Sequence, residues 1–173
     1  MEEIMYVVDE KDQFVRKAAR QEVIQKALLH RTARVIVTNG SGLFLVQKRS
    51  ADKDIYPSHW DIGIAGIVRG GESYEGTAMR ELMEEAGIIG ISNIQLMHSF
   101  LFKIRYSSPV YNAHCKAYML HYEGKIIPQK DEMDEVRFIE AEDVKELMGK
   151  PQFHPVGKIV FDKYLERTII NTQ

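Results

Sequence analysis

The chain has 173 residues, of which 45% are hydrophobic and 28% are charged, and its formal net charge is −2. This length fits a single domain over residues 1–173, the composition excludes a disordered or fibrous protein, and the lack of net positive charge argues against a nucleic-acid partner. A single cysteine, an acidic N-terminal stretch MEEIMYVVDEKDQ and the lack of an apolar run near the ~20 residues that cross a bilayer predict a cytoplasmic protein without a membrane partner.

The first third of the chain predicts two hairpins with a helix between them. Residues 6–18, YVVDEKDQFVRKA, are typical of two short strands around a polar turn, and residues 20–30, RQEVIQKALLH, carry a helical apolar stripe. This N-terminal β-hairpin and helix occupy about residues 1–30. Next, RVIVT at 34–38 and LFLVQKR at 43–49 are separated by NGSG, which supplies the turn glycines of a second hairpin.

The remainder predicts a sheet interrupted by helices. Residues 51–60 form a loop, because Pro57 is unsuited to a regular ladder, and WDIGIAGIV at 60–68 is a strand whose glycines allow close approach of another backbone. Long, paired strands follow at 94–106 and 110–123, then a short strand at 134–140 and helices at 141–148 and 155–170. This order indicates an α+β fold with a mixed β-sheet between helices.

Residues 73–86 predict an acidic helix after a glycine-rich turn. Ser73 is a suitable N-cap, and Gly87 suits the left-handed residue after the helix end. At about 100° per residue, one face collects four apolar residues as a buried stripe, namely Met79, Leu82, Met83 and Ala86. Three carboxylates fall within an arc of roughly 100° on the far side, namely Glu81, Glu84 and Glu85.

Three clustered carboxylates repel one another unless a cation lies among them. Like charges four residues apart, as at Glu81 and Glu85, destabilise an isolated helix by a few tenths of a kcal/mol. Mg²⁺ suits such a cluster, because it prefers oxygen ligands and bridges carboxylates to substrate phosphates. An ordinary solvated acidic face is the alternative, and the ExxEE spacing alone does not exclude it.

The surrounding residues extend this spacing to G-x5-E-x7-R-E-L-x-E-E-x-G-I over residues 66–88. The pattern is identical to the signature of the Nudix hydrolase family, and the chain is identified as resembling that family over most of the domain. The resemblance implies a strand–loop–helix element within an α/β/α sandwich. It also implies Mg²⁺- or Mn²⁺-dependent hydrolysis of a small-molecule diphosphate substrate, typically a nucleoside diphosphate linked to another moiety. A homodimer is frequent among family members of this length.

The resemblance also implies a role for each signature residue. The metal cluster would be Glu81, Glu84 and Glu85, and Gly66 would offer its backbone carbonyl. Glu72 would support the loop or an additional metal, and Arg80 would orient the glutamates through ion pairs.

The sequence offers more than one candidate for the general base and for the residues that bind phosphate. Glu81 is one candidate base, and the segment QKDEMDEV offers Glu132 and Glu135, although a charge run is more often solvated. Three cations near strand ends are candidates for phosphate contacts, namely Arg34, Lys48 and Arg49. The alternative for each is a solvated surface charge.

Two other functions compete with hydrolysis. The segment from residue 28 to 66 also resembles the Nudix-fold isopentenyl diphosphate isomerases, but Ala65 and Ile67 stand where those enzymes carry a catalytic cysteine and a metal-binding histidine. Only His30 matches an isomerase histidine, so isomerase chemistry is disfavoured. A non-catalytic nucleotide-binding or regulatory module on the same fold is the second rival. The sequence does not identify the specific substrate.

Overall fold

A mixed β-sheet forms the centre of the protein. The structure, a computed structural model, describes residues 3–105 and 110–170; the chain ends included in the predicted domain, and Tyr106 at the end of a predicted strand, lie outside these ranges. Within them, seven strands form the central sheet. They are β3 (His30–Thr38), β4 (Phe44–Arg49), β5 (Trp60–Ile62), β6 (Ile64–Ile67), β7 (Gln95–Arg105), β8 (Val110–His121) and β9 (Met133–Ile139).

The sheet is mixed because one of its pairs is parallel. Strands β3 and β8 run parallel, whereas β8 pairs with β7, and β4 with β5 and β9, in antiparallel fashion. The main strand order is β5-β4-β3-β8-β7, with β6 beside β3 and β9 beside β4. This arrangement confirms the predicted α+β class.

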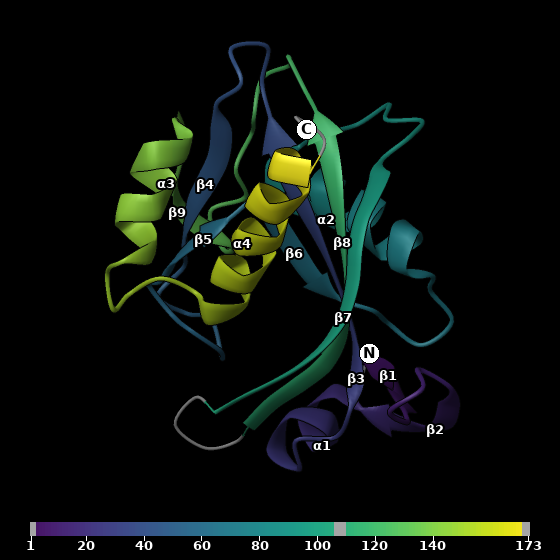
Figure 1. Ribbon diagram of the computed structural model, residues 1–173. Helices are drawn as coiled ribbons and strands as arrows, with labels where there is room; N and C mark the ends of the chain where they lie inside the picture. The colour runs from purple at the N-terminus through teal and green to yellow at the C-terminus, as the bar shows by residue number, and fades with distance from the viewer. Residues whose placement is uncertain (1–2, 106–109, 171–173) are drawn as a thin grey trace.

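Helices cover both faces of the sheet (Figure 1). One face packs against α3 (Ala141–Met148) and α4 (Pro155–Ile170) in a core that includes Ile36, Phe153 and Phe161. The other face packs against α2 (Tyr74–Ala86) in a second core that includes Val35 and Leu82. Because successive residues of β3 point to opposite faces, Val35 and Ile36 belong to different cores. The predicted α/β/α sandwich is therefore confirmed.

The N-terminal segment forms its own small unit at one end of the sheet (Figure 1). Strands β1 (Ile4–Val8) and β2 (Phe14–Ala19) pair antiparallel, which confirms the predicted hairpin. Helix α1 covers only Arg20–Gln25, so the helix predicted over residues 20–30 was too long. The helix ends there because Ala27 has a φ of +51°, and the amide of Leu28 donates to the carbonyl of Val23 over 2.9 Å before the chain enters β3.

The second predicted hairpin is confirmed at its turn, but its two strands separate beyond the turn. Strands β3 and β4 are joined by the expected tight turn, but they pair only at Thr38 and Phe44. Beyond that point the edge of β3 pairs with β6, and β4 lies between β5 and β9. A local hydrophobic pattern indicates strands but does not say which strands become neighbours.

The strand predicted over residues 60–68 is divided at Gly63. Residues before it pair with β4, and residues after it pair with β3, so Gly63 lets the chain change partners. Its φ angle is +67°, and a Cβ atom there would lie 1.9 Å from the carbonyl oxygen of Val35. Both the backbone conformation and the close approach require glycine.

We expect Gly63→Ala to lower the free energy of unfolding by about 2–3 kcal/mol, because an added methyl group collides with fixed backbone. Gly90→Ala is the matched control, since its φ is +73° with no atom within 4 Å of the added Cβ. It should cost only the strain of a left-handed alanine, about 1 kcal/mol. Urea denaturation of both variants measures the difference, and equal losses would contradict the assigned contact with Val35.

Helix α2 begins and ends as predicted, but its buried face is rotated from the predicted one. Ser73 Oγ accepts a hydrogen bond from the amide of Gly76, and Gly87 follows the helix with a φ of +66°. Met83, predicted to be buried, is 51% exposed, whereas Glu85, predicted to lie opposite the apolar stripe, is 4% exposed. The helix therefore directs a carboxylate toward the sheet, among Leu82 and other core residues.

In the part of the chain that the structure describes, no helix is both long and apolar enough to cross a membrane.

Candidate active site

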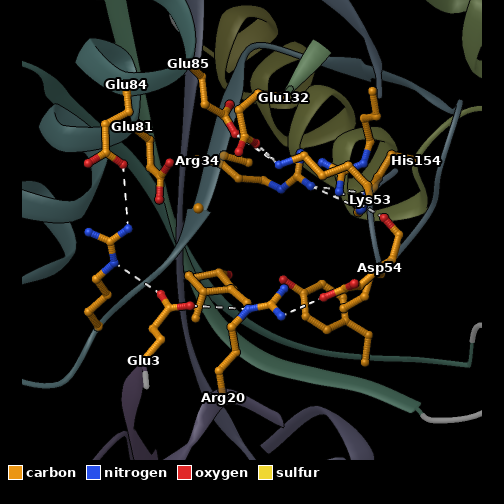
Figure 2. A pocket seen from close by; sticks show the side chains of 18 residues that line it. Glu3, Arg20, Arg34, Lys53, Asp54, Glu81, Glu84, Glu85, Glu132 and His154 are labelled. Carbon is orange, nitrogen blue, oxygen red and sulfur yellow. Dashed lines mark hydrogen bonds and ion pairs between the residues drawn. The ribbon is translucent and has the colours of Figure 1, made fainter. Parts of the chain in front are cut away.

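A pocket of about 320 Å³ lies between the acidic helix α2, the central sheet and the N-terminal unit. Most of its lining is polar, and Figure 2 shows the charged side chains that surround it. Six carboxylates contribute, namely Glu3, Asp54, Glu81, Glu84, Glu85 and Glu132. Five cations interleave with them, namely Arg20, Arg34, Arg49, Lys53 and Arg69.

Strand β6 and helix α2 bring Gly66 and Glu81 into contact in this pocket. A Cβ atom at Gly66 would lie 1.9 Å from Glu81 Oε1 and 2.3 Å from its Cγ. The glycine therefore leaves the space that the Glu81 carboxylate occupies beside the backbone of β6. This contact is the physical reason for glycine at the first position of the 66–88 signature.

Arg80 holds three glutamates of the signature together from behind the pocket. Its Nε and Nη2 donate to both oxygens of Glu72 over 2.8 and 3.0 Å. Its Nη1 donates to Glu81 over 2.6 Å and to Glu84 over 2.9 Å. Arg80 is thus the fixed centre on which the acidic side chains are arranged.

Glu72 does not line the pocket. Besides Arg80, it accepts hydrogen bonds from Thr77 Oγ1 (2.6 Å) and from the amide of Arg69 (3.2 Å). Partial burial opposes its ionisation, but the hydrogen bonds from Arg80 and Thr77 outweigh this effect and lower the pKa of Glu72 to about 2. In this structure Glu72 connects the glycine-rich loop to Arg80.

Glu85 is the most deeply buried carboxylate of the pocket. Its Oε2 has no hydrogen-bond partner among the described residues, and Lys53 Nζ lies 3.8 Å from its Oε1. Burial, with the nearby charge of Glu81 as a second cause, raises the pKa of Glu85 to about 7. Burial also raises the pKa of Glu81. A carboxylate in this setting is strongly disfavoured as an isolated anion.

These oxygens fit the requirements of a hard divalent cation. Such an ion would supply the positive charge that the unpartnered oxygen of Glu85 lacks, and Glu81 adds a second carboxylate nearby. Within residues 3–105 and 110–170, however, no three acidic, histidine or cysteine side chains are already grouped as a metal site. Glu81 and Glu84 instead pair with Arg80, and Glu132 pairs with Lys53.

The two predicted loop glutamates lie in different places. Glu132 lines the pocket and forms an ion pair with Lys53, as Figure 2 shows. Its segment is attached to the end of α2, because the amide of Gln129 donates to the carbonyl of Glu85 over 2.9 Å. Glu135 lies on β9, is half exposed and is not part of the pocket lining.

The three cations that were predicted to contact phosphate also lie in different places. Arg34 and Arg49 line the pocket, whereas Lys48, one residue earlier on β4, does not. Arg49 donates to the carbonyls of Tyr56 (3.2 Å) and Ile55 (2.9 Å), which fix it against the 50–59 loop. Arg34 Nη1 donates to the buried Asp61 over 2.8 Å.

Several pocket residues were missed by sequence reasoning. Arg20 pairs with Glu3 (3.5 Å) and Asp54 (2.6 Å), and Glu3 pairs with Arg69 (3.1 Å), so a chain of ion pairs follows one side of the pocket (Figure 2). These residues come from the N-terminal unit, the 50–59 loop and the glycine-rich loop. No motif connects them in the sequence, and only the fold brings them together.

The positions that distinguish the isomerases also line the pocket. Ala65 and Ile67 lie on either side of Gly66 in the wall of the pocket. Neither side chain can transfer a proton or bind a metal. His30 is buried, and its Nδ1 lies 2.9 Å from the carbonyl of Leu28, so it is not part of the pocket lining.

This chain is similar to known proteins in a family model, in sequence and in structure. A family model described as the NUDIX domain matches residues 28–158. The chain is 31% identical to an uncharacterized Nudix hydrolase of Streptomyces coelicolor over 156 residues, or 90% of this chain and 84% of that one. It is 27% identical to the isopentenyl-diphosphate delta-isomerase of Schizosaccharomyces pombe, over 95% of this chain and 82% of that one. The crystal structure of DR0079 from Deinococcus radiodurans matches with a TM-score of 0.77 at 20% identity, over 94% of this chain and 99% of that one.

Proposed function

This chain belongs to the Nudix family, and we propose that it is a metal-dependent hydrolase that cleaves the diphosphate linkage of a nucleoside diphosphate derivative or a related small molecule. Nudix hydrolases generally cleave pyrophosphate bonds. The observation that supports the proposal is that one pocket contains both the buried carboxylate of Glu85 and cations suited to phosphate, among them Lys53 and Arg49.

The metal would be Mg²⁺ or Mn²⁺, held by Glu81, Glu84, Glu85 and the backbone carbonyl of Gly66. When bound, a divalent ion neutralises phosphoryl oxygens and lowers the pKa of a coordinated water. Glu72 contributes indirectly, because it fixes Arg80, which in turn fixes Glu81 and Glu84.

The remaining pocket residues would bind the diphosphate and move the proton. Arg34 and Arg49 offer guanidinium groups that donate to phosphoryl oxygens. Glu132 and Glu81 are the two candidate proton acceptors that face the pocket. Glu135 and Lys48 have no part in this proposal, since neither lines the pocket.

Two alternatives make different demands on the site. Isomerase chemistry needs a proton donor, and Ala65 and Ile67 supply none in the pocket wall. A binding-only module needs no intact acidic cluster, yet all three acidic residues of the α2 signature line the pocket. Cytoplasmic location and homodimer formation stay predictions.

The test is hydrolysis of a substrate panel by the wild type beside Glu84→Gln. The panel contains nucleoside diphosphates, nucleotide sugars, ADP-ribose, dinucleoside polyphosphates and isopentenyl diphosphate, each with Mg²⁺, with Mn²⁺ or with EDTA. We expect metal-dependent release of phosphate or nucleotide, reduced at least about a hundredfold in the variant because one carboxylate of the cluster is neutralised.

Glu75→Gln is the control, because Glu75 lies on the same helix but is exposed and outside the pocket. Nucleotide binding by the wild type without turnover of any compound would favour the binding module. Isomerisation of isopentenyl diphosphate without hydrolysis would favour the isomerase.

A further inference from the structure

A buried ion pair lies in the pocket wall outside the 66–88 signature. Arg34 on β3 and Asp61 on β5 are 5% and 0% exposed, and Arg34 Nη1 donates to Asp61 Oδ1 over 2.8 Å. Asp61 Oδ1 also accepts from the amide of Ile62, but Oδ2 has no hydrogen-bond partner among the described residues. Such a pair is a poor way to stabilise a fold, because desolvation of both charges offsets their attraction. A role in the pocket that Arg34 lines explains this pair better than a contribution to stability does.

The start of α4 lies against the carboxylate of this pair. A Cβ atom at Gly157 would lie 2.1 Å from Asp61 Oδ1, so the absence of a side chain lets the carboxylate approach the first turn of this helix. The N-terminal end of a helix carries partial positive charge, which stabilises an anion there. Asp61 is thus hydrogen-bonded to Arg34 and to the amide of Ile62, and it lies against the start of α4.

His154, immediately before α4, holds the guanidinium. Its Nδ1 lies 3.2 Å from Arg34 Nη2 and also accepts a hydrogen bond from the amide of Val156 over 3.2 Å. Burial lowers the pKa of His154 well below its usual range, so the ring is neutral and its Nδ1 can accept. The backbone of His154 is itself fixed, because its amide donates to the carbonyl of Trp60 over 2.7 Å.

A guanidinium has five N–H donors, and these contacts occupy only two of its nitrogens. In the part of the chain that the structure describes, no other acceptor of the Arg34 donors is found. Arg34 and His154 both line the pocket, and Figure 2 shows Arg34 between the carboxylates of α2 and His154. The free donors can therefore meet an anionic group of a ligand in the pocket.

We propose that Asp61 and His154 are positioning residues that present the Arg34 guanidinium, in one fixed orientation, to a phosphoryl group of the substrate. The proposal rests on the proposed function for its substrate class. It adds a rigid anion-binding group, built by β3, β5 and the start of α4, that is separate from the carboxylates of the metal cluster. Rigid placement favours binding because less side-chain freedom is lost when the ligand arrives.

The test measures binding of inorganic pyrophosphate in EDTA, so that it needs neither metal nor turnover. Isothermal titration calorimetry compares the wild type with Arg34→Met, Asp61→Asn and the double variant. Loss of a charged donor should weaken pyrophosphate binding about tenfold or more in Arg34→Met. Asp61→Asn should weaken it about three- to tenfold, and the double variant should bind no more weakly than Arg34→Met, because Asp61 acts through Arg34.

Asp61→Asn distinguishes the loss of Arg34 orientation from the simple removal of a negative charge near the pocket. Removal of a negative charge near the pocket should strengthen anion binding by Coulomb attraction alone, so a weaker complex requires loss of orientation. Stronger binding by Asp61→Asn, additive effects in the double variant, or wild-type affinity in Arg34→Met would each overturn the proposal. These outcomes are independent of hydrolysis, so failure of the proposed function is read separately from the substrate panel.

Gly157→Ala supplies a test that keeps all three polar residues. The added methyl group displaces the Asp61 carboxylate, and we expect weaker pyrophosphate binding, by about threefold or more. Gly149→Ala after α3 is the matched control, since its backbone is helical and the nearest atom to the added Cβ lies 3.3 Å away. Unchanged affinity in Gly157→Ala would also overturn the positioning role, even if Asp61→Asn failed to fold.

Discussion

Glu85→Gln is expected to reduce kcat for diphosphate hydrolysis by about a thousandfold, the range seen when one preorganised charge at a reaction centre is removed. Glu85 is the buried carboxylate whose Oε2 has no partner among residues 3–105 and 110–170, so its charge is the one most available to a divalent ion. The amide retains the shape of the side chain and one acceptor oxygen but removes the negative charge. Steady-state kinetics at saturating Mg²⁺ measure the effect.

Glu75→Gln is again the control, because it removes the same charge from the exposed side of α2 and should leave kcat unchanged. Metal binding gives a second measurement that does not depend on the substrate. At a metal concentration about 100 times Kd, a bound ion stabilises the folded state by about 2.7 kcal/mol, so Mg²⁺ or Mn²⁺ should raise the wild-type Tm. The Tm of Glu85→Gln should respond far less. Full hydrolysis by this variant would rule out Glu85 as part of the reaction centre.

The order of elements and the acidic helix could be predicted because their signals are local. Ser73 and Gly87 limit α2 through hydrogen bonding and backbone conformation within a few residues, and the structure has both as predicted. The contact between Gly66 and Glu81 is also local, since it needs only one strand, one loop and one helix, so the spacing of the two residues is informative in the sequence itself.

The burial of Glu85 could not be predicted from the helix alone. Apolar residues on α2 include Met83, and a helical projection places Met83 in the apolar stripe and Glu85 outside it. Which residues are buried depends on where the sheet lies, and the sheet packs against Leu82 and Ala86 from the side that also covers Glu85. A carboxylate can thus occupy a buried position that hydrophobicity would not assign to it.

The rest of the pocket depends on contacts between distant segments. Arg20 meets Asp54 because α1 lies beside the 50–59 loop, and Arg34 meets Asp61 and His154 because β3, β5 and the start of α4 lie together. Each of these residues is an ordinary polar residue in its local sequence. Arg34 and Arg49 were predicted as phosphate contacts together with Lys48, and the direction of each side chain, not its charge, decided which of them lines the pocket.

Arg80→Met is expected to lower both activity and stability, because a single guanidinium holds Glu72, Glu81 and Glu84. Its removal leaves three neighbouring carboxylates without their shared cation. Loss of a side chain that orients metal ligands typically reduces metal affinity or activity about 10–100-fold. Because Glu84 is partly solvated, we expect a loss of about 2–4 kcal/mol in the free energy of unfolding, less than for a fully buried network.

Arg16→Met is the matched control, since Arg16 also donates from Nη1 and Nη2 to one glutamate, Glu22, but at an exposed site. It should change the free energy of unfolding by no more than about 0.5 kcal/mol and leave hydrolysis unaffected. Arg80→Lys keeps the charge at position 80 but not the planar fork that reaches several carboxylates at once, so it should recover only part of the loss.

The dependence on metal concentration separates orientation from a general loss of folding. If Arg80 arranges Glu81 and Glu84 for a divalent ion, the Arg80→Met enzyme should need about 10–100 times more Mg²⁺ for half-maximal activity, as expected when a ligand-orienting residue is lost. A variant that was merely less stable would keep the wild-type Mg²⁺ requirement for its folded fraction. An unchanged requirement would therefore place Arg80 among the structural residues of α2 and leave the arrangement of the acidic cluster to its other contacts.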